Sequence, residues 1–224
     1  MIPVAASLLA ARWLFDFPSG PDTSALLVLL YATATFLSAF LLIPIDPEIS
    51  TRSFLAFVGR CLATVMTFLA ATQIDTQVHV TVIQILRLST VLFLLLLCAL
   101  SLLQIFAEQR INARQIGFFA IAMFTSIPLW LGSIAEITGN HLVTTNLIVG
   151  ANPLTALAVS LEFDYLRTNW FYQHSVLGSL RYEYYSWSSY VFILISLTTA
   201  LAIRATGAKY HHILYPFRKR ESTS

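Results

Sequence analysis

The sequence predicts an all-α protein that crosses a membrane several times, and composition and apolar run length carry the prediction. Of the 224 residues, 57% are apolar and 11% are charged, whereas an average soluble domain has about 25% charged residues. The mean hydropathy is +0.75. A soluble fold of this length buries only about 70–75% of its surface, which would leave large apolar patches in water. A soluble globular enzyme and a disordered chain are therefore excluded.

Five apolar runs are interpreted as membrane-spanning helices, because a helix needs about 20 mainly apolar residues to cross about 30 Å of hydrocarbon. A span isolated in lipid must also satisfy its backbone hydrogen bonds internally. The five runs cover residues 24–45, 54–72, 79–106, 115–133 and 187–203. Pro44 and Pro47 end the first run, because each removes a backbone donor. A basic tail, residues 204–224, follows the last run.

Residues 142–161 are apolar enough to be a further span, but Asn152 and Pro153 lie at their midpoint. Proline removes a backbone hydrogen bond and asparagine adds an amide that lipid cannot satisfy, so a straight lipid-facing helix is disfavoured. The Asn152 amide can instead cap the backbone groups that the break exposes. We therefore expect this segment to enter the membrane and turn back as a re-entrant hairpin.

The positions of the basic residues favour this topology, because short loops rich in lysine and arginine stay on the cytoplasmic side. With five spans and a hairpin, nine of the 13 basic residues lie on one face and three on the other, with Arg87 near the outer end of its span. Seven of the 11 acidic residues lie on the outer face. The prediction is one multi-pass domain, residues 1–224, in a cell membrane, a bacterial inner membrane, with the C-terminus in the cytoplasm. A rival interpretation makes residues 1–17 a degenerate sixth membrane element.

An aromatic outer segment, residues 162–186, follows the hairpin. Six of the nine tyrosines lie within residues 165–190, with two of the four tryptophans. Such rings settle at the depth of the lipid headgroups, so an interfacial belt is one interpretation, with an i,i+3 surface pair between Asp164 and Arg167. The other is an outer recognition surface for a headgroup, a sugar or a partner protein. Its candidate residues are Asp164, Arg167, Trp170, Tyr172, His174 and Arg181.

Arg87 is the one charged residue in the third span. A charge at bilayer depth usually faces a partner or a wet cavity, but near a helix end arginine can extend to the headgroups. We expect Arg87 to extend in this way, with Gln84 and His79 as polar neighbours on the same face.

No residue pattern indicates catalysis, a metal site or a cofactor. Haem needs axial ligands that face one another across a bundle, and none of the five histidines lies deep in a predicted span. The two cysteines, Cys61 and Cys98, lie in apolar runs and are interpreted as small buried hydrophobic residues. There is no phosphate-binding glycine loop. We expect no cofactor and no enzyme activity, with any ATPase activity in a partner chain.

The stretch Asn152-Pro153-Leu154-Thr155, followed by Arg167, resembles the membrane (permease) subunits of ATP-binding-cassette exporters of the polysaccharide and drug-efflux type. The resemblance implies an outer re-entrant gate at Asn152 and Pro153. It also implies a cytoplasmic segment that docks on an ATPase, with candidate residues Glu48, Arg52 and Arg60. The implied partners are an ATPase subunit and a second membrane subunit, and the implied substrate is amphipathic or lipid-linked.

A second hypothesis is a non-catalytic structural or assembly subunit of a larger membrane complex. The scarcity of polar residues in the spans favours it, because a pathway for hydrophilic cargo should contain more of them. The aromatic outer segment would then be a docking surface for other subunits.

Overall fold

The computed structural model describes residues 21–42, 51–74, 80–107, 113–130, 142–168 and 182–214. The elements are α2 (Pro21–Leu42), α3 (Thr51–Ile74), α4 (Val82–Ala107), α5 (Ala113–Trp130), α7 (Leu142–Ala151), α8 (Pro153–Ser160), a short 3-10 helix η1 (Tyr165–Arg167) and α10 (Trp187–Leu214). These residues contain α-helices and a 3-10 turn and no strand, so the predicted all-α class is confirmed. Residues 1–17 lie outside the described part, and their predicted membrane element stays a prediction.

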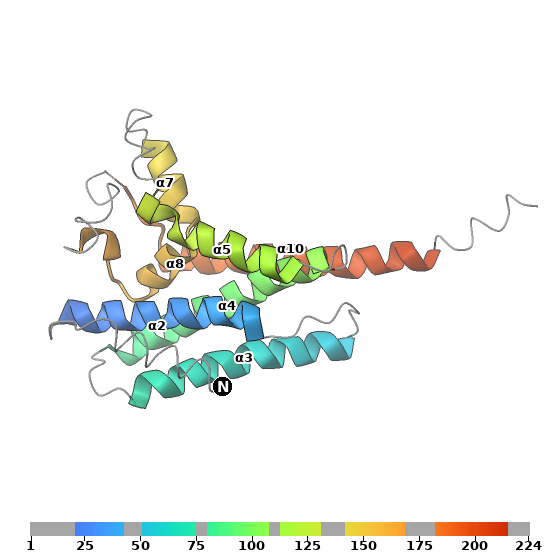
Figure 1. Cartoon of the computed structure of the whole chain (residues 1–224), viewed down its shortest axis with the longest axis horizontal. Coiled ribbons are helices and arrows are strands. Elements are labelled where there is room, and N and C mark those ends of the chain that lie inside the picture. The colour runs from blue at the N-terminus through green and yellow to red at the C-terminus, as the bar shows by residue number, and fades with distance from the viewer. Residues whose placement is uncertain are drawn as a thin grey trace, which may run out of the picture.

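The helix α4 is the central element of the bundle. It packs against α2, α3, α5, α8 and α10, while α2, α3, α5 and α10 extend along the long axis in Figure 1. Its buried side chains recur every three or four residues, the spacing of one helical face: Leu88, Val91, Leu92, Leu95, Leu96, Leu100 and Leu103. A continuous apolar face on α4 thus organises the core.

The helices α4 and α10 begin at the same end of the bundle. The indole Nε1 of Trp187, the first residue of α10, donates a hydrogen bond of 3.3 Å to the carbonyl oxygen of Arg87, near the start of α4. At the same end, Gln84 Nε2 donates to the carbonyl of Leu161, just after α8, at 2.8 Å. We call this the α8 end of the bundle.

The helix α5 runs in the opposite direction to α4. Gly117, near the start of α5, lies against Leu103, near the end of α4. Near the end of α5, the carbonyl of Phe124 accepts a hydrogen bond from Asn152, between α7 and α8. Between α5 and α10, the described helix α7 stands away from the bundle and α8 packs against α4 and α2 (Figure 1).

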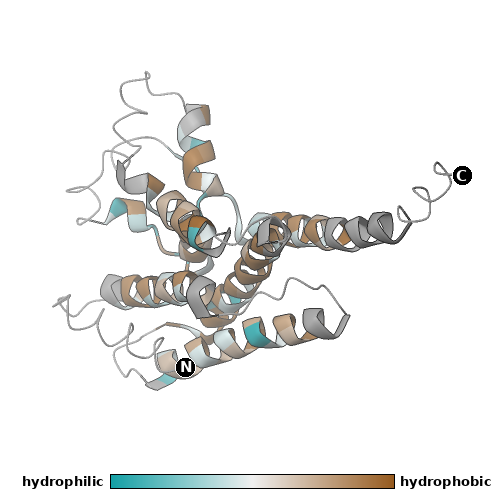
Figure 2. Cartoon of the chain, turned by 45° about the vertical axis from the view of Figure 1, so that its right-hand side comes forward, coloured by the Kyte–Doolittle hydropathy of each residue, from teal (hydrophilic) through white to brown (hydrophobic). Residues whose placement is uncertain are grey.

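Two helices are long and apolar enough to cross a bilayer within the part of the chain that the structure describes. They are Leu55–Gln73 within α3, with a mean hydropathy of 1.7, and Val82–Leu103 within α4, with a mean hydropathy of 2.4. Shorter apolar stretches occur at Ser24–Ala39, Gln115–Ile127 and Trp187–Ile203. Hydrophobic residues predominate along the helices in Figure 2. Length and composition thus support membrane association, and five separate crossings stay a prediction.

The outward faces of the helices carry large apolar side chains. Exposed examples are Leu62 and Met66 on α3, Phe119 and Met123 on α5, and Phe192 on α10. A soluble protein rarely leaves so much contiguous apolar surface in water, so these faces suit a lipid environment.

The observed helix bounds differ from the predicted spans by a few residues, with one larger difference. The predicted last span stops at residue 203, but α10 continues to Leu214. The predicted span coincides with the apolar stretch Trp187–Ile203, and the helix continues beyond it because Arg204 and Lys209 limit an apolar run without ending a helix. Arginine and lysine are good helix formers.

Two helical glycines test how closely the helices pack. A Cβ at Gly117 would lie 1.9 Å from Leu103 Cδ2, whereas a Cβ at Gly59 on α3 would have nothing within 4 Å. Leu103 is 4% exposed, so its side chain has little room to move.

We expect Gly117→Ala to lower the free energy of unfolding by about 1–3 kcal/mol through overpacking. Gly59→Ala should raise it by up to about 1 kcal/mol through helix propensity. Denaturant unfolding in detergent micelles measures both, and equal effects of the two variants would contradict the close α4–α5 contact.

Candidate functional site

The break between α7 and α8 is built around Asn152, which is 1% exposed. Its backbone is extended, and its side-chain Oδ1 accepts a hydrogen bond of 2.8 Å from the backbone N–H of Leu154. Pro153 occupies the first turn of α8, where its missing N–H would have no helical partner. Asn152 therefore has the capping contacts that the sequence predicts, while a role as a gate stays a prediction.

The same asparagine joins α8 to α5. Its Nδ2 donates to the carbonyls of Phe124 and Thr125 at 2.8 and 3.3 Å. Residue 128 is a proline, so the Phe124 carbonyl lacks the N–H donor that a helix normally supplies four residues later. The Asn152 amide supplies that missing donor. One side chain thus satisfies backbone groups of two helices.

The C-terminal end of α8 is a Schellman motif with an unusual residue at its left-handed position. The N–H of Glu162 bonds to the carbonyl of Val159 at 3.1 Å, and the N–H of Phe163 bonds to that of Ala158 at 3.0 Å. Glu162 has φ of 56°. Glycine is the usual residue here, and a side chain costs about 1–2 kcal/mol in this region. The contacts of the Glu162 carboxylate offset this cost.

That carboxylate forms an ion pair with Arg87. Arg87 Nη1 contacts Glu162 Oε1, across 75 residues of sequence. The Arg87 guanidinium also lies 5.8 Å from the centre of the Trp187 ring, within the range of a cation–π contact. The predicted extension of Arg87 to the headgroups with Gln84 beside it was incomplete, because it missed both of these partners. His79 lies outside the described residues.

Asp164 is the centre of a second polar cluster. Its Oδ1 accepts hydrogen bonds from the hydroxyls of Tyr182 at 2.9 Å and Tyr184 at 2.5 Å. Its Oδ2 lies 3.2 Å from Arg167 Nε, which confirms the predicted i,i+3 pair. Arg167 also lies 5.8 Å from the centre of the Tyr182 ring. Tyr182 and Tyr184 near Asp164 therefore form specific polar contacts, while a headgroup belt stays a prediction.

Residues 182–186, which we call the strap, connect these clusters to α7. The backbone N–H of Glu183 donates to Asn146 Oδ1 at 3.0 Å. A Cβ at Gly150 would lie 2.3 Å from the Tyr185 ring, so glycine at this position allows the strap to approach α7. The strap then leads directly into α10 at Trp187.

The tyrosines around Asp164 stay protonated at neutral pH. Burial, and then hydrogen bonding to the Asp164 carboxylate, raise the pKa of Tyr182 to about 12. The same causes raise the pKa of Tyr184 above its ordinary value. Burial also raises the pKa of Tyr165, whose hydroxyl bonds to Thr155 Oγ1 at 2.9 Å. The Tyr182 and Tyr184 hydroxyls thus remain available to donate to Asp164.

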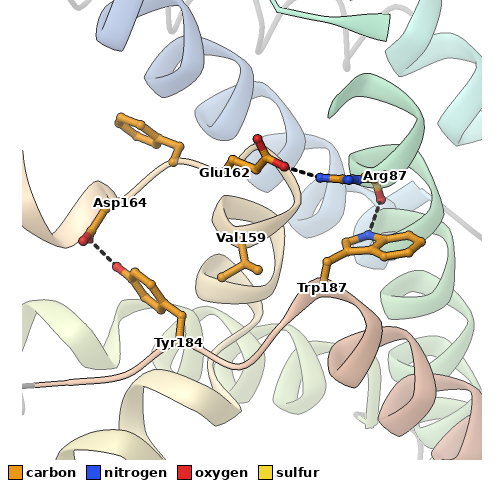
Figure 3. Close-up of a pocket in the computed structure, with 7 residues that line it drawn as sticks. Arg87, Val159, Glu162, Asp164, Tyr184 and Trp187 are labelled. Atoms are coloured by element: carbon orange, nitrogen blue, oxygen red, sulfur yellow. Dashed lines mark hydrogen bonds and ion pairs between the residues drawn. The ribbon is translucent and has the colours of Figure 1, made fainter. Parts of the chain in front are cut away.

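A pocket of about 370 Å³ lies between the two clusters. In Figure 3 the Arg87–Glu162 pair and the Asp164–Tyr184 pair flank Val159, with Trp187 below Arg87. The volume is within the range of small-ligand sites. The side chains of Arg87 and Glu162 are 35% and 62% exposed, so a ligand can reach both charges. The lining residues are Arg87, Val159, Glu162, Phe163, Asp164, Tyr184 and Trp187.

The structure brings together part of the predicted outer recognition surface. Asp164 and Arg167 are in contact, whereas the other four members lie outside the described residues: Trp170, Tyr172, His174 and Arg181. Of the predicted docking residues, Arg60 is half-buried in α3, Arg52 lies in the first turn of α3, and Glu48 lies outside the described part. The docking role of all three stays a prediction.

Sequence reasoning did not assign Glu162, Tyr182, Tyr184 and Trp187 to a site. A usable signal was the single charge of Arg87 in an apolar span. Such a charge often pairs with an acidic partner at the same depth, and Glu162 follows the hairpin predicted at the same outer face. Within the described ranges, no group of three His, Cys, Asp or Glu residues could hold a metal ion.

Comparisons of the chain with known protein families, with curated proteins and with solved structures find no match. Its function is therefore argued from its own residues and their geometry.

Proposed function

We propose that this chain is the membrane-embedded permease subunit of an ATP-driven transporter that moves an amphipathic or lipid-linked substrate. Its partners would be an ATPase subunit and a second membrane subunit. The observation that carries the proposal is the broken α7–α8 segment, in which α8 packs against α4 and α2 and Asn152 ties the break to α5. A broken helix is tolerated at membrane depth where protein or a cavity covers it, and such an element is suited to gating an outer exit.

The proposed topology has five crossings, an outer α8 end and a cytoplasmic C-terminus in a bacterial inner membrane. The helix α3 begins, and α10 ends, at the end of the bundle away from α8 (Figure 1). Arg52 therefore lies toward that end, and the basic residues 204–214 occupy the last part of α10. The positive-inside rule then assigns that end to the cytoplasm.

The buried polar residues favour an amphipathic substrate over a hydrophilic one. Among the described residues, the buried polar groups are hydroxyls of serine, threonine and tyrosine and the amide of Asn152, and none is charged. Several of the hydroxyls bond to carbonyls of their own helix, such as Ser89 to Ile85 at 2.7 Å and Ser160 to Ala156 at 2.8 Å. The described interior thus offers little polar surface to a passing solute.

The same observation favours a second candidate, a non-catalytic structural or assembly subunit of a larger membrane complex. In that case the strap and the residues around Asp164 would serve as a docking surface. Such a subunit would need neither a pathway nor an ATPase.

Purification of the tagged chain in mild detergent, followed by identification of the bound proteins, separates the two candidates. We expect a soluble ATPase subunit to copurify. Replacing Glu48 and Arg52 together with alanine should remove most of it while the chain stays in the membrane. The matched control is Glu183→Ala with Arg167→Ala at the α8 end, which removes the same charges and should retain the ATPase. Recovery of several membrane chains without an ATPase would contradict the permease proposal and support the structural subunit.

A further inference from the structure

We propose that the pocket between α4, α8 and α10 binds the zwitterionic headgroup of a phosphatidylethanolamine-type lipid. The phosphate would pair with Arg87 and the ammonium with Glu162. The inference requires that the chain sits in a membrane, and it holds whether or not an ATPase partner exists.

The two charged residues of the pocket keep unused hydrogen-bonding capacity. A guanidinium has five N–H donors and an ionised carboxylate has two acceptor oxygens. Within the described part of the chain, Arg87 Nη1 meets Glu162 Oε1, and Glu162 Oε2 has no hydrogen-bond partner. Both residues line the pocket. A donor array and a free acceptor therefore lie side by side on one wall.

This pairing of charges selects a ligand that carries both signs. Asp164, the other carboxylate of the pocket, is already engaged by two phenols and by Arg167. A purely anionic headgroup would be attracted by Arg87 and repelled by Glu162. A simple cation would be attracted by Glu162 and repelled by Arg87. Only a ligand with adjacent positive and negative groups gains at both positions.

The surroundings of the pocket fit the depth of a lipid headgroup. Trp187 begins α10, and Tyr184 lies in the strap beside it. Such rings concentrate at the membrane–water interface. The side chains of Ile83 and Leu86, on the same turns of α4 as Arg87, are apolar and exposed, so they offer a surface for acyl chains. The pocket would hold the headgroup while the chains stay in the bilayer.

The backbone at Glu162 holds the carboxylate in this position. Its left-handed conformation, at φ of 56°, is the Schellman position that glycine usually fills. A glutamate at a position where the backbone favours glycine points to a functional role for its side chain. We assign Glu162 the role of binding the positive group of a zwitterion, next to the Arg87 that it pairs with.

The test measures binding of short-chain lipids to the purified full chain in detergent by calorimetry. Phosphatidylethanolamine is compared with phosphatidylglycerol and phosphatidylcholine of the same acyl length. Free phosphoethanolamine is measured as well, because it carries the headgroup without acyl chains. We expect phosphatidylethanolamine to bind about tenfold or more tightly than phosphatidylglycerol, a ratio that one additional charge-assisted hydrogen bond supplies. Methylation in phosphatidylcholine removes the ammonium donors, so it should also bind more weakly.

Variants assign the two halves of the site. Arg87→Gln should weaken binding of phosphatidylethanolamine and phosphatidylglycerol alike, by about tenfold or more. Glu162→Gln should weaken phosphatidylethanolamine alone and remove its advantage over phosphatidylglycerol. Glu162→Gly, which the backbone tolerates well, should behave like Glu162→Gln and guards against a folding defect. The control Glu183→Gln removes a strap carboxylate outside the pocket and should change nothing.

Equal affinity for all three lipids, or a preference that survives Glu162→Gln, would overturn the proposal, as would tighter binding of phosphatidylglycerol than of phosphatidylethanolamine. Free phosphoethanolamine that binds as tightly as the lipid would support the same zwitterion chemistry with a soluble source. Much weaker binding of the free headgroup would support the lipid.

Discussion

Asn152→Leu is expected to lower the free energy of unfolding by about 3 kcal/mol. The change removes the cap of α8, which costs about 1 kcal/mol. It also leaves the part-buried carbonyl of Phe124 without the Asn152 donor, at about 1–3 kcal/mol. The Phe124 carbonyl has no helical alternative, since residue 128 is a proline. Unfolding in mixed micelles with increasing denaturant measures the loss.

Two further variants test the reason for this loss. Asn152→Asp keeps the acceptor for Leu154 N–H but turns a second oxygen toward the Phe124 carbonyl, so it isolates the contact between α8 and α5. Asn146→Leu removes a half-exposed amide that accepts one bond from Glu183 N–H and should cost less than about 1 kcal/mol. Equal losses for Asn152→Leu and Asn146→Leu would contradict the structural role of Asn152.

Asp164→Ala is expected to release the strap and to lower stability by about 2–3 kcal/mol, because a partly buried carboxylate accepts bonds from two phenols and an arginine. Hydrogen exchange measures the loss of backbone protection segment by segment. Protection should fall in residues 182–186 and at η1, while α3 on the far side of α4 stays protected. A uniform loss across all helices would instead indicate global unfolding. Glu183→Ala serves as the control, since only its backbone is bonded to α7.

Alkaline titration gives an independent test of the same cluster. Tyr182 has a pKa of about 12 in the folded protein against an ordinary value of 10.0, so the folded state keeps a proton that the unfolded chain releases. The contribution of Tyr182 to stability is therefore fully present below pH 10 and is lost as the pH rises toward 12. Asp164→Asn should lower the pKa of Tyr182 and shift the onset of tyrosinate absorbance to lower pH. Subtraction of a Tyr182→Phe titration isolates the signal, and an onset that does not move would contradict the assigned contact.

The sequence predicts the helical class and the main breaks well, because both depend on local chemistry. Apolar run length locates α3 and α4, and Asn152 with Pro153 predicts the boundary between α7 and α8 because each acts on its own backbone. The apolar run 187–203 matches the apolar stretch of α10 but does not locate the end of that helix, since it measures a fit to lipid and not the extent of a helix. The number of crossings and the side on which each end lies stay predictions.

The pocket could not be predicted in the same way, because its parts meet only through tertiary packing. Arg87 and Glu162 are 75 residues apart, and their contact depends on α8 ending beside the start of α4. The left-handed conformation of Glu162 adds to the difficulty, since a glutamate gives no local signal of a helix C-terminus, whereas a glycine would. Asp164 and Arg167 were identified together because an i,i+3 spacing is local.

The unbroken length of α10 gives the molecule a mechanical property. Its 28 residues form a rod roughly 42 Å long, which exceeds the roughly 30 Å thickness of a bilayer's hydrocarbon layer. One tip of the rod is Trp187, whose ring centre lies 5.8 Å from the Arg87 guanidinium, and the other tip carries Arg204 and Lys209. Because the helix is continuous, tilting or sliding one tip displaces the other, so a partner that binds the tip proposed to lie in the cytoplasm would also move the tryptophan that lines the pocket.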